Sequence, residues 1–299
     1  MYYYIVNPAA GHGQIKNLQD KLRTRLDQLG IRGEWAKTTG PGDATRLAKA
    51  AVASGHTTIV AIGGDDTVNE VINGVDQDTA AVGIIPLGTS NRVATQLGIL
   101  TWPQACEALA ARRLTPYSLI AAGQKFFLST LTLGFETDLD KTIDMSEKGW
   151  RARAGQFAKS LGHASHYGSL GCKIEVDGKF TLTCNNLFSL TVANQKFLNP
   201  LADNRLIIAL SDRPSAKLRL GSLVWQTLRS GSRGTLEDTA TTRFLADRVV
   251  IETDPPTGIM VDGKVAGRTP IAIRLTDRRV RFITEKIVAD FKDAVGPKP

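Results

Sequence analysis

The chain has 299 residues, of which 42% are hydrophobic and 22% are charged, and it carries a formal net charge of +8. Its length accommodates two domains of ordinary size, each with its own core. The composition is typical of a globular protein and excludes a disordered chain. The opening sequence, MYYYIVNPAAG, lacks the basic region and apolar run of a secretory signal. No window approaches the roughly 18 uninterrupted apolar residues that a membrane-spanning helix needs.

The cysteines and histidines disfavour disulfides and a dedicated metal site. Cys106, Cys172 and Cys184 are odd in number and far apart in the sequence, so neither a disulfide framework nor a CxxC pair can be built from them. We expect a reducing cytoplasm, with the thiols as small core residues. The histidines lack zinc-site spacing, although His163 and His166 lie three apart on an expected helix and could share a face.

The positive charge is unevenly distributed along the chain. Between residues 204 and 283, 14 Lys and Arg stand against 8 Asp and Glu. A basic surface can meet nucleic acid, an anionic membrane or a phosphorylated ligand, or can simply be solvated. Aromatic residues, which nucleic-acid-binding modules interleave with basic ones, are sparse here. We expect no nucleic-acid partner, but transient contact with an anionic membrane, with the protein cytoplasmic or peripheral at the inner membrane face. The oligomeric state is left open.

The first third of the chain alternates strand and helix patterns, which predicts right-handed βαβ units and a parallel sheet. Leucines at helical spacing mark the first helix, and Asp43 is positioned to cap the second. The expected strands cover residues 2–6, 31–37, 58–62 and 81–85, and the expected helices cover residues 11–29, 43–54, 68–73 and 102–111.

From residue 117 onward the pattern changes to short β-type runs. Asp177-Gly178 and Asp262-Gly263 are typical of hairpin turns. The expected strands cover residues 125–133, 172–176, 179–183, 186–193, 206–210 and 248–252, with helices at 155–167, 216–229 and 284–295. We therefore predict an α/β domain with a parallel sheet over residues 1–116, a β-rich sandwich domain over 117–283, and a C-terminal segment, 284–299, that packs back on the first domain.

The strongest chemical feature is GGDDTVNE, residues 63–70, which joins a buried strand to a helix. Glycines at such a junction let the backbone approach a ligand, and the amides at the helix N-terminus favour an anion. Two further loops, residues 6–11 after the first strand and 86–91 after the fourth, are also rich in small residues. Loops that follow parallel strands gather at one edge of the sheet, so we expect one phosphate-binding site there.

These motifs resemble the diacylglycerol kinase-like lipid kinases, which include the sphingosine kinases and the bacterial lipid kinases. The family's GGDGTxNE stands here as GGDDTVNE, its NPxxG opening as residues 7–11, and its LGTxND as residues 87–92 except at the last position. The resemblance extends in the family's order through residues 39–44, 134–135, 192–194 and 261–263, which is nearly the whole chain. It implies the fold shared by NAD kinases and diacylglycerol kinases.

The resemblance also implies an ATP site in a cleft between the domains and a lipid substrate that enters from the β-rich domain. Asp262 would be the general base that takes the proton of the lipid hydroxyl. Mg²⁺ would bridge the phosphates, and its ligands stay unassigned. The residues implied to line the nucleotide are Asn7, Thr39, Gly63, Gly64, Asp65, Thr67, Gly88 and Thr89.

Three positions depart from the family pattern, and all fall in the implied site. Asp66 stands for a glycine, Arg92 for an aspartate and Lys264 for a glutamate. A carboxylate at Asp66 repels phosphate, and two potential magnesium ligands are lost. Because Asp66 and Arg92 lie on neighbouring loops, we hypothesise that they pair.

The sequence therefore favours an ATP-dependent lipid kinase that acts on a hydroxyl of a diacylglycerol-like or sphingoid lipid. The main alternative is a non-catalytic protein of the same fold that binds nucleotide or lipid. An NAD kinase shares the glycine-rich loop and the two-domain plan, but Asn69-Glu70 directly after the loop is typical of the lipid kinases. Simpler interpretations stay open, because Asp262 could serve only as a turn residue and Asp65 only as a helix cap.

Overall fold

The computed structural model describes residues 1–13, 15–75, 79–135, 137, 170–212, 241–262 and 264–285. The helices expected at 155–167 and 216–229, with His163 and His166, lie outside these residues, as does most of the expected C-terminal helix. The chain divides into two compact units, Met1–Leu128 with Gln195–Asn204 and Thr276–Pro299, and Ser129–Asn194 with Arg205–Leu275. The domain boundaries proposed from the sequence stay a prediction.

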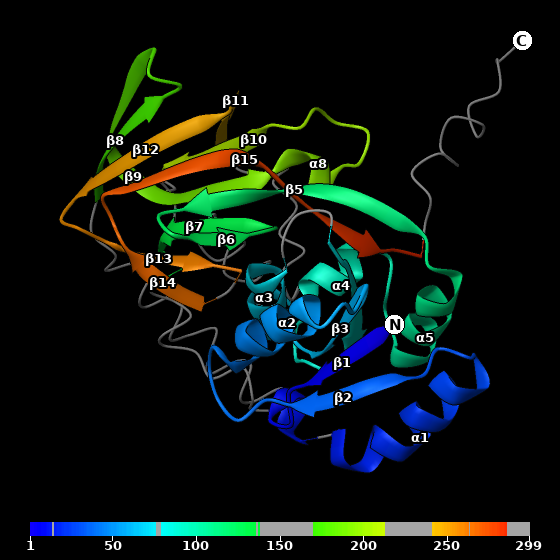
Figure 1. The fold of residues 1–299 in the computed structure, drawn as a ribbon. Coiled ribbons are helices and arrows are strands. Elements are labelled where there is room, and N and C mark those ends of the chain that lie inside the picture. Colours follow the sequence, from blue (N-terminus) through cyan, green and yellow to red (C-terminus); the bar gives the residue numbers. More distant parts are fainter. Residues whose placement is uncertain are drawn as a thin grey trace, which may run out of the picture. The chain divides into compact units, whose positions relative to one another are not determined.

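A parallel sheet forms the centre of the first unit (Figure 1). Its order is β2-β1-β3-β4, followed by the end of β15. Burial along the whole of β3 and β4 explains why both are almost continuously apolar. Val6 is level with Ile62 and Lys37, and Gly63 is level with Pro86, so the strands end together. The bounds are β1 Tyr2–Val6, β2 Gly33–Lys37, β3 Thr58–Gly63, β4 Ala81–Pro86 and β15 Ile271–Ile283.

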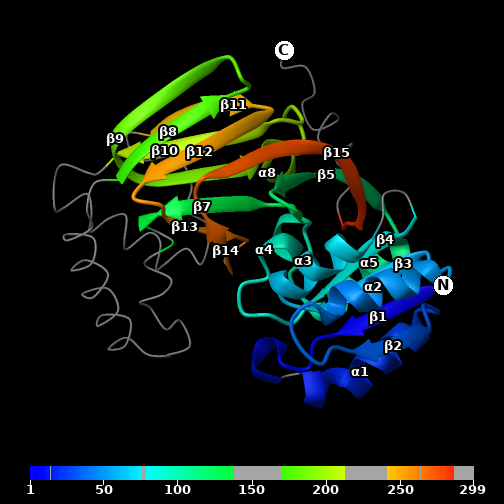
Figure 2. The same ribbon diagram turned by 60° about the vertical axis from the view of Figure 1, so that its left-hand side comes forward.

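Helices cover both faces of this sheet (Figure 2). The pairs α1 with α5 and α2 with α3 pack together, as right-handed crossovers require. The expected helix at 11–29 is interrupted because Gly11 and Gly13 have positive φ angles, 57° and 79°. No helix in the described part of the chain is long and apolar enough to cross a membrane. The bounds are η1 Ala10–Gly13, α1 Ile15–Gln28, α2 Asp43–Ala53, α3 Asp65–Gly74, α4 Arg92–Gln96, α5 Trp102–Ala111 and α8 Gln195–Leu198.

Strand β15 was not expected from the sequence, yet it completes the first unit. Arg281 and Phe282 pair in parallel with residues of β4. Strand β15 also pairs with β5 (Leu114–Ala122), which forms a hairpin with β6 (Lys125–Phe127). The Arg278 guanidinium lies over the Phe126 ring, 4.5 Å from its centroid, and donates to the Val75 carbonyl at 2.6 Å. This charged strand therefore fixes the hairpin to the rest of the unit.

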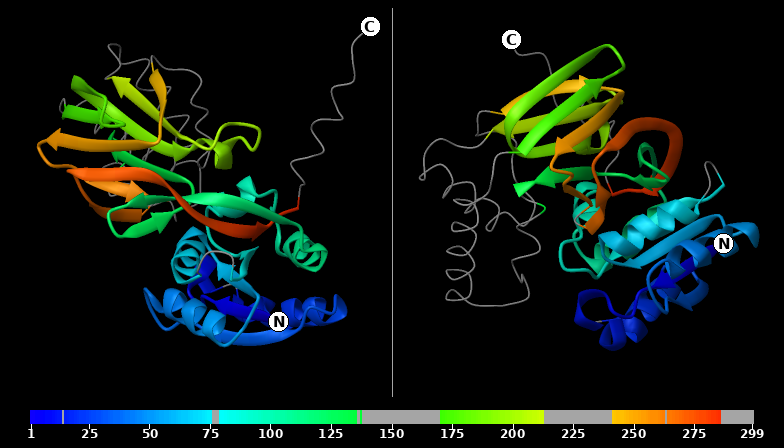
Figure 3. Two further views of the ribbon diagram at one scale, coloured as in Figure 1. Left: turned by 45° about the horizontal axis from the view of Figure 1, so that its top comes forward. Right: turned by 90° about the vertical axis from the view of Figure 1, so that its left-hand side faces the viewer.

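The second unit is β-rich and antiparallel, as expected (Figure 3). Its order is β14-β13-β7-β9-β8-β12-β15, and β10 pairs with both β9 and β11. Strand β9 is one strand of 15 residues where the sequence predicts two. The hairpin turn at Asp177-Gly178 is confirmed by φ angles of 51° and 66°. The bounds are β7 Thr130–Gly134, β8 Leu170–Val176, β9 Phe180–Asn194, β10 Leu206–Asp212, β11 Thr241–Ala246, β12 Arg248–Asp254, β13 Gly258–Val261 and β14 Lys264–Arg268.

The three cysteines are free thiols. Cys106 and Cys172 are buried core residues, as expected, and burial raises the pKa of the Cys106 thiol to about 11 and that of Cys172 to about 12. Although they are distant in the sequence, Cys172 and Cys184 are directly opposite each other across β8 and β9. A second effect on Cys172 is the neighbouring Cys184, which raises the same pKa further.

Candidate functional site

Four loops at the carboxyl ends of the parallel strands carry the nucleotide-site residues that the sequence predicts. Asn7 follows β1 and Thr39 follows β2, while the GGDD loop, residues 63–66, joins β3 to α3. Gly88 and Thr89 follow β4. Since the strands end level with one another, these loops share one edge of the sheet. The structure thus brings this set of residues together within the first unit.

Asn7 and Thr67 connect the first and third of these loops. The Asn7 Nδ2 atom donates to Thr67 Oγ1 at 3.1 Å, and Asn7 Oδ1 accepts from the amide of Ala9 at 3.0 Å. Thr67 is buried under Gly63, where a Cβ atom would lie only 2.4 Å from Thr67 Oγ1. Position 63 therefore requires glycine, because a side chain there would collide with Thr67.

The GGDD loop also touches the loop after β4 directly. A Cβ atom on Gly88 would lie 2.4 Å from the Gly64 Cα, and one on Gly64 would lie 3.2 Å from the Gly88 Cα. Asn91 also holds Gly88, accepting from its amide at 2.8 Å and donating to its carbonyl at 2.7 Å. The absence of side chains at positions 64 and 88 thus lets two backbones meet.

We expect a Gly88→Ala substitution to disrupt this contact, because a clash with backbone cannot be relieved by a rotamer change. The variant should have a lower thermal midpoint than the wild type and at least tenfold weaker ATP binding by calorimetry, a loss of about 1.4 kcal/mol. Gly40→Ala is the matched control, since a Cβ there meets nothing within 4 Å. Equal behaviour of the two variants would contradict the requirement for this contact.

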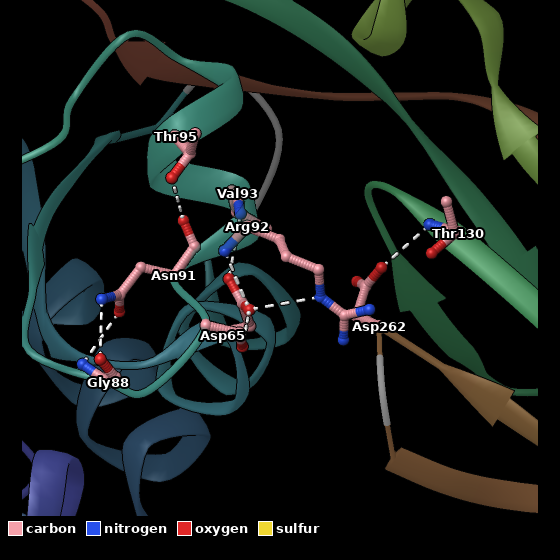
Figure 4. Close-up of polar contacts among 9 residues, drawn as sticks. Asp65, Gly88, Asn91, Arg92, Val93, Thr95, Thr130 and Asp262 are labelled. Atoms are coloured by element: carbon pink, nitrogen blue, oxygen red, sulfur yellow. Dashed lines mark hydrogen bonds and ion pairs between the residues drawn. The ribbon is translucent and has the colours of Figure 1, made fainter. Parts of the chain in front are cut away.

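Asp65 joins the same two loops through its buried carboxylate (Figure 4). Oδ1 accepts from the Val93 amide at 2.9 Å, and Oδ2 accepts from the Arg92 amide at 3.0 Å and from the Ser90 hydroxyl at 2.9 Å. The Arg92 and Val93 amides open α4, whose N-cap residue Asn91 makes no side-chain cap. Asp65 therefore caps a helix, but that helix is α4 and not α3, in whose first turn it lies.

Glu70 plays the equivalent part for α2. Its Oε1 accepts from the Gly42 amide at 2.9 Å and its Oε2 from the Ala44 amide at 3.1 Å. Asp43, expected to cap α2, is instead the first residue of that helix, after N-cap Gly42. Its Oδ2 accepts from both the amide and the hydroxyl of Thr39, at 2.9 and 3.1 Å. Thr39, an exposed residue, is thus held against α2.

The hydrogen bond from the Thr39 amide, followed by that from the Arg46 side chain, holds the pKa of the Asp43 carboxyl below its usual value. A carboxyl whose pKa is lowered by folding stabilises the protein fully above its unfolded pKa, about 3.9, and loses this contribution as the pH falls through the lower folded pKa. Asp43→Asn should therefore be less stable than the wild type at pH 7. The difference should shrink below about pH 4, as urea unfolding at both pH values would measure. A pH-independent difference would contradict this.

The altered residues Asp66 and Arg92 occupy this edge as well. Asp66 is half-buried in the first turn of α3 and is helical, so this position does not need the positive φ that glycine allows. The Arg92 Nε lies 3.6 Å from Asp65 Oδ2, which makes Asp65 an ionic partner of Arg92. The pair between Arg92 and Asp66 stays a prediction.

Asp262 belongs to the second unit, at the end of β13. Its amide donates to the Thr130 carbonyl at 2.9 Å, and its Oδ1 accepts from the Thr130 amide at 2.9 Å. The residue is 7% exposed and has a φ of 48°, which aspartate tolerates better than most residues. It is therefore a turn residue with an oriented carboxylate. Gly263, its neighbour in the DGK motif, lies outside the described residues.

The edge suits the phosphates of a nucleotide better than it suits a protein-held metal. Gly64 carries no side chain at the start of α3, where backbone amides favour an anion. By contrast, the described part of the chain contains no group of three or more His, Cys, Asp or Glu side chains that could hold a metal ion. The oxygens of Asp65 are engaged by three hydrogen bonds, so Asp65 does not fit the role of a metal ligand.

Glu70, Ser90 and Asn91 were not among the predicted site residues, although all three organise its loops. Glu70 ends the GGDDTVNE motif, and Ser90 and Asn91 lie in the loop of residues 86–91. Asn91 has a positive φ of 47°, a conformation in which asparagine is enriched, so an asparagine in this loop is the signal that could have pointed to it. The partners of Glu70 and Ser90 lie about 25 residues away in the sequence, so no local pattern reveals them.

Residues 1–122 match the model of the diacylglycerol kinase catalytic domain. This match confirms the resemblance to the diacylglycerol kinases.

Among curated relatives, the diacylglycerol kinase of Bacillus subtilis (strain 168) is 28% identical over 194 residues, which are 64% of each protein. A YegS-like probable lipid kinase of Pseudomonas aeruginosa (strain UCBPP-PA14) is 35% identical over 128 residues, or 42% of this chain and 41% of the relative. The chain thus spans less than two thirds of the length of either relative.

The fold of the whole chain also has a solved counterpart. A crystal structure of a candidate diacylglycerol kinase from Bacillus anthracis str. Sterne superimposes with a TM-score of 0.75. The comparison covers 95% of both chains at 23% sequence identity. At this identity the likeness concerns the fold, and it confirms an α/β region with parallel strands followed by a β-rich region.

Proposed function

We propose that the protein is an ATP-dependent lipid kinase that phosphorylates a hydroxyl of a diacylglycerol-like or sphingoid lipid. One observation carries the proposal, and it lies in the region that matches the kinase catalytic domain. There the loops of Gly64 and Gly88 are in backbone contact, and Asp65 of the first loop caps α4, which follows the second. A site of this kind is organised before any ligand arrives, and preorganisation is what phosphoryl transfer demands of the protein.

In this proposal the first unit holds the nucleotide. The Gly64 and Gly88 backbones, the first amides of α3, and the Asn7–Thr67 pair face the phosphates, with Thr39 and Thr89 at the exposed margin. Membership in a kinase family suggests ATP and a divalent metal such as Mg²⁺, which offsets charge on the transferred group. Asp65 supports these loops through its three hydrogen bonds.

Asp262 is the proposed general base. A base must accept a proton at one oxygen while it stays in position. The Thr130 amide fixes Oδ1 at 2.9 Å and so orients the carboxylate. In the proposed reaction Asp262 accepts the proton of the lipid hydroxyl as the hydroxyl oxygen attacks the γ-phosphorus, and the leaving nucleoside diphosphate departs with the bonding electron pair.

Transfer of labelled phosphate from ATP tests the proposal. The acceptors are mixed micelles of diacylglycerol, phosphatidylglycerol, sphingosine or ceramide, with and without anionic lipid, since we also propose transient contact with an anionic membrane surface. A labelled lipid product from at least one acceptor is the expected result. No product from any acceptor, despite ATP binding, would contradict it.

A non-catalytic protein of the same fold is the second candidate, and Asp66 favours it. Asp66 adds a half-buried carboxylate to the first turn of α3, the helix end that our proposal assigns to the phosphates. At 4 Å two like charges repel by about 1–4 kcal/mol. Under this alternative the wild type binds nucleotide or lipid without transfer. The triple substitution Asp66→Gly, Arg92→Asp, Lys264→Glu then restores transfer.

A further inference from the structure

The guanidinium of Arg92 is fixed in place at the site edge (Figure 4). The Arg92 amide donates to Asp65 Oδ2 at 3.0 Å, and Nε of the same residue lies 3.6 Å from the same oxygen. Both the backbone and the side chain are thus held by one buried carboxylate. The Arg92 side chain is only 29% exposed, which restricts its conformations further.

Asp65 does not depend on this guanidinium. Its oxygens already accept two amides and the Ser90 hydroxyl at 2.9–3.0 Å, whereas Nε of Arg92 lies beyond hydrogen-bond range. The capping of α4 uses the Arg92 backbone, which any residue except proline supplies. A positively charged side chain at position 92 is therefore not explained by the stability of the loop.

The terminal nitrogens of the guanidinium are the part of Arg92 that could contact a ligand. Guanidinium carries five N–H donors, and the two terminal nitrogens hold four of them. Within the described ranges, neither terminal nitrogen of Arg92 has a hydrogen bond or an ion pair, since its two recorded contacts are those with Asp65. A planar, oriented and unengaged fork of this kind binds the oxygens of a phosphoryl group in a bidentate manner.

We infer that Arg92 is a binding residue for a phosphoryl group and that it supplies affinity which requires no metal ion. The inference rests on the proposed function for its setting, the phosphate edge of the first unit. It also explains how this edge tolerates Asp66, since one cation at position 92 offsets one added carboxylate. The phosphoryl group that binds Arg92 could belong to a nucleotide or to a lipid headgroup. Binding measurements with each kind of ligand distinguish these two sources.

Calorimetric titration with ATP and with inorganic pyrophosphate, in EDTA and again in Mg²⁺, tests the inference. Arg92→Gln should weaken ATP binding in EDTA by roughly 10- to 100-fold, and Arg92→Lys, which keeps the charge but loses the fork, by an intermediate factor. Arg25→Gln is the matched control, because Arg25 is 38% exposed and pairs with Glu107 on the distant helices α1 and α5. Thermal unfolding of each variant verifies folding.

Flotation with phosphatidic acid vesicles forms the second arm. Loss of vesicle binding in Arg92→Gln, with ATP affinity intact, assigns the phosphoryl group to a lipid headgroup. ATP and vesicle binding that both match the wild type within twofold in Arg92→Gln would overturn the inference and leave the proposed function standing. If ATP affinity depends on Arg92 but no lipid is phosphorylated, the inference stands and the proposed function fails.

Discussion

An Asp65→Ala variant is expected to lose roughly 2–4 kcal/mol of its free energy of unfolding and to bind no ATP. The substitution removes a buried acceptor of three hydrogen bonds, so the Arg92 and Val93 amides lose their partner at the start of α4. A buried donor without a partner costs about 1–3 kcal/mol. Asp65→Asn, which keeps one acceptor oxygen, should be less severe.

Urea unfolding followed by tryptophan fluorescence measures this effect, since Trp35 and Trp102 both lie in the first unit. Asp27→Ala is the control, because Asp27 and its partner Arg32 are 54% and 80% exposed at the side chain. The control should change the free energy of unfolding by no more than about 0.5 kcal/mol. If Asp65→Ala were as stable as the control, Asp65 would not be the residue that joins the loops.

An Asp262→Asn variant is expected to fold normally and bind ATP like the wild type, but to transfer phosphate about 10²- to 10⁴-fold more slowly, because general-base catalysis is worth this much. Folding should persist because asparagine tolerates the φ of 48° and its side-chain oxygen can still accept the Thr130 amide. Initial rates with labelled ATP at saturating lipid, together with circular dichroism, measure both properties.

Asp177→Asn is a close structural control for this variant. Asp177 also has a positive φ, 51°, and its Oδ1 accepts two backbone amides, from Asp247 and Arg248. It belongs to a hairpin turn that no part of the proposed mechanism uses. Transfer should continue unchanged in Asp177→Asn, and an Asp262→Asn variant that kept more than a tenth of the activity would exclude Asp262 as the base.

Much of the first unit could be predicted from the sequence because its signals are local. Apolar runs placed β1, β3 and β4 within one residue, and the helix expected at 102–111 has the bounds of α5. Strand β15 was not predicted, because its many charged residues obscure the alternation of buried and exposed positions. Its parallel partner, β4, also lies about 200 residues earlier in the sequence. The short helix α4 was not predicted either, because the residue that caps its first turn, Asp65, lies about 27 residues earlier in the sequence.

The site was predicted in position better than in mechanism. The glycines at 63, 64 and 88 suggested close approach to a ligand, whereas the structure adds a reason within the protein: two backbones and the Thr67 side chain occupy that space. The sequence suggested Asp66 as the partner of Arg92, and that pair stays a prediction, while the structure adds the contact between Arg92 and Asp65. Consecutive helical residues point about 100° apart, so charge pairing between loops cannot be assigned from sequence neighbours.

The central claim is tested most directly by measuring phosphate transfer from labelled ATP to the lipid panel. The wild type is compared with Asp262→Asn and with the triple substitution Asp66→Gly, Arg92→Asp, Lys264→Glu. We predict a labelled lipid product with the wild type that is lost in Asp262→Asn. A silent wild type together with an active triple variant would contradict the kinase and identify a binding protein built on a kinase fold.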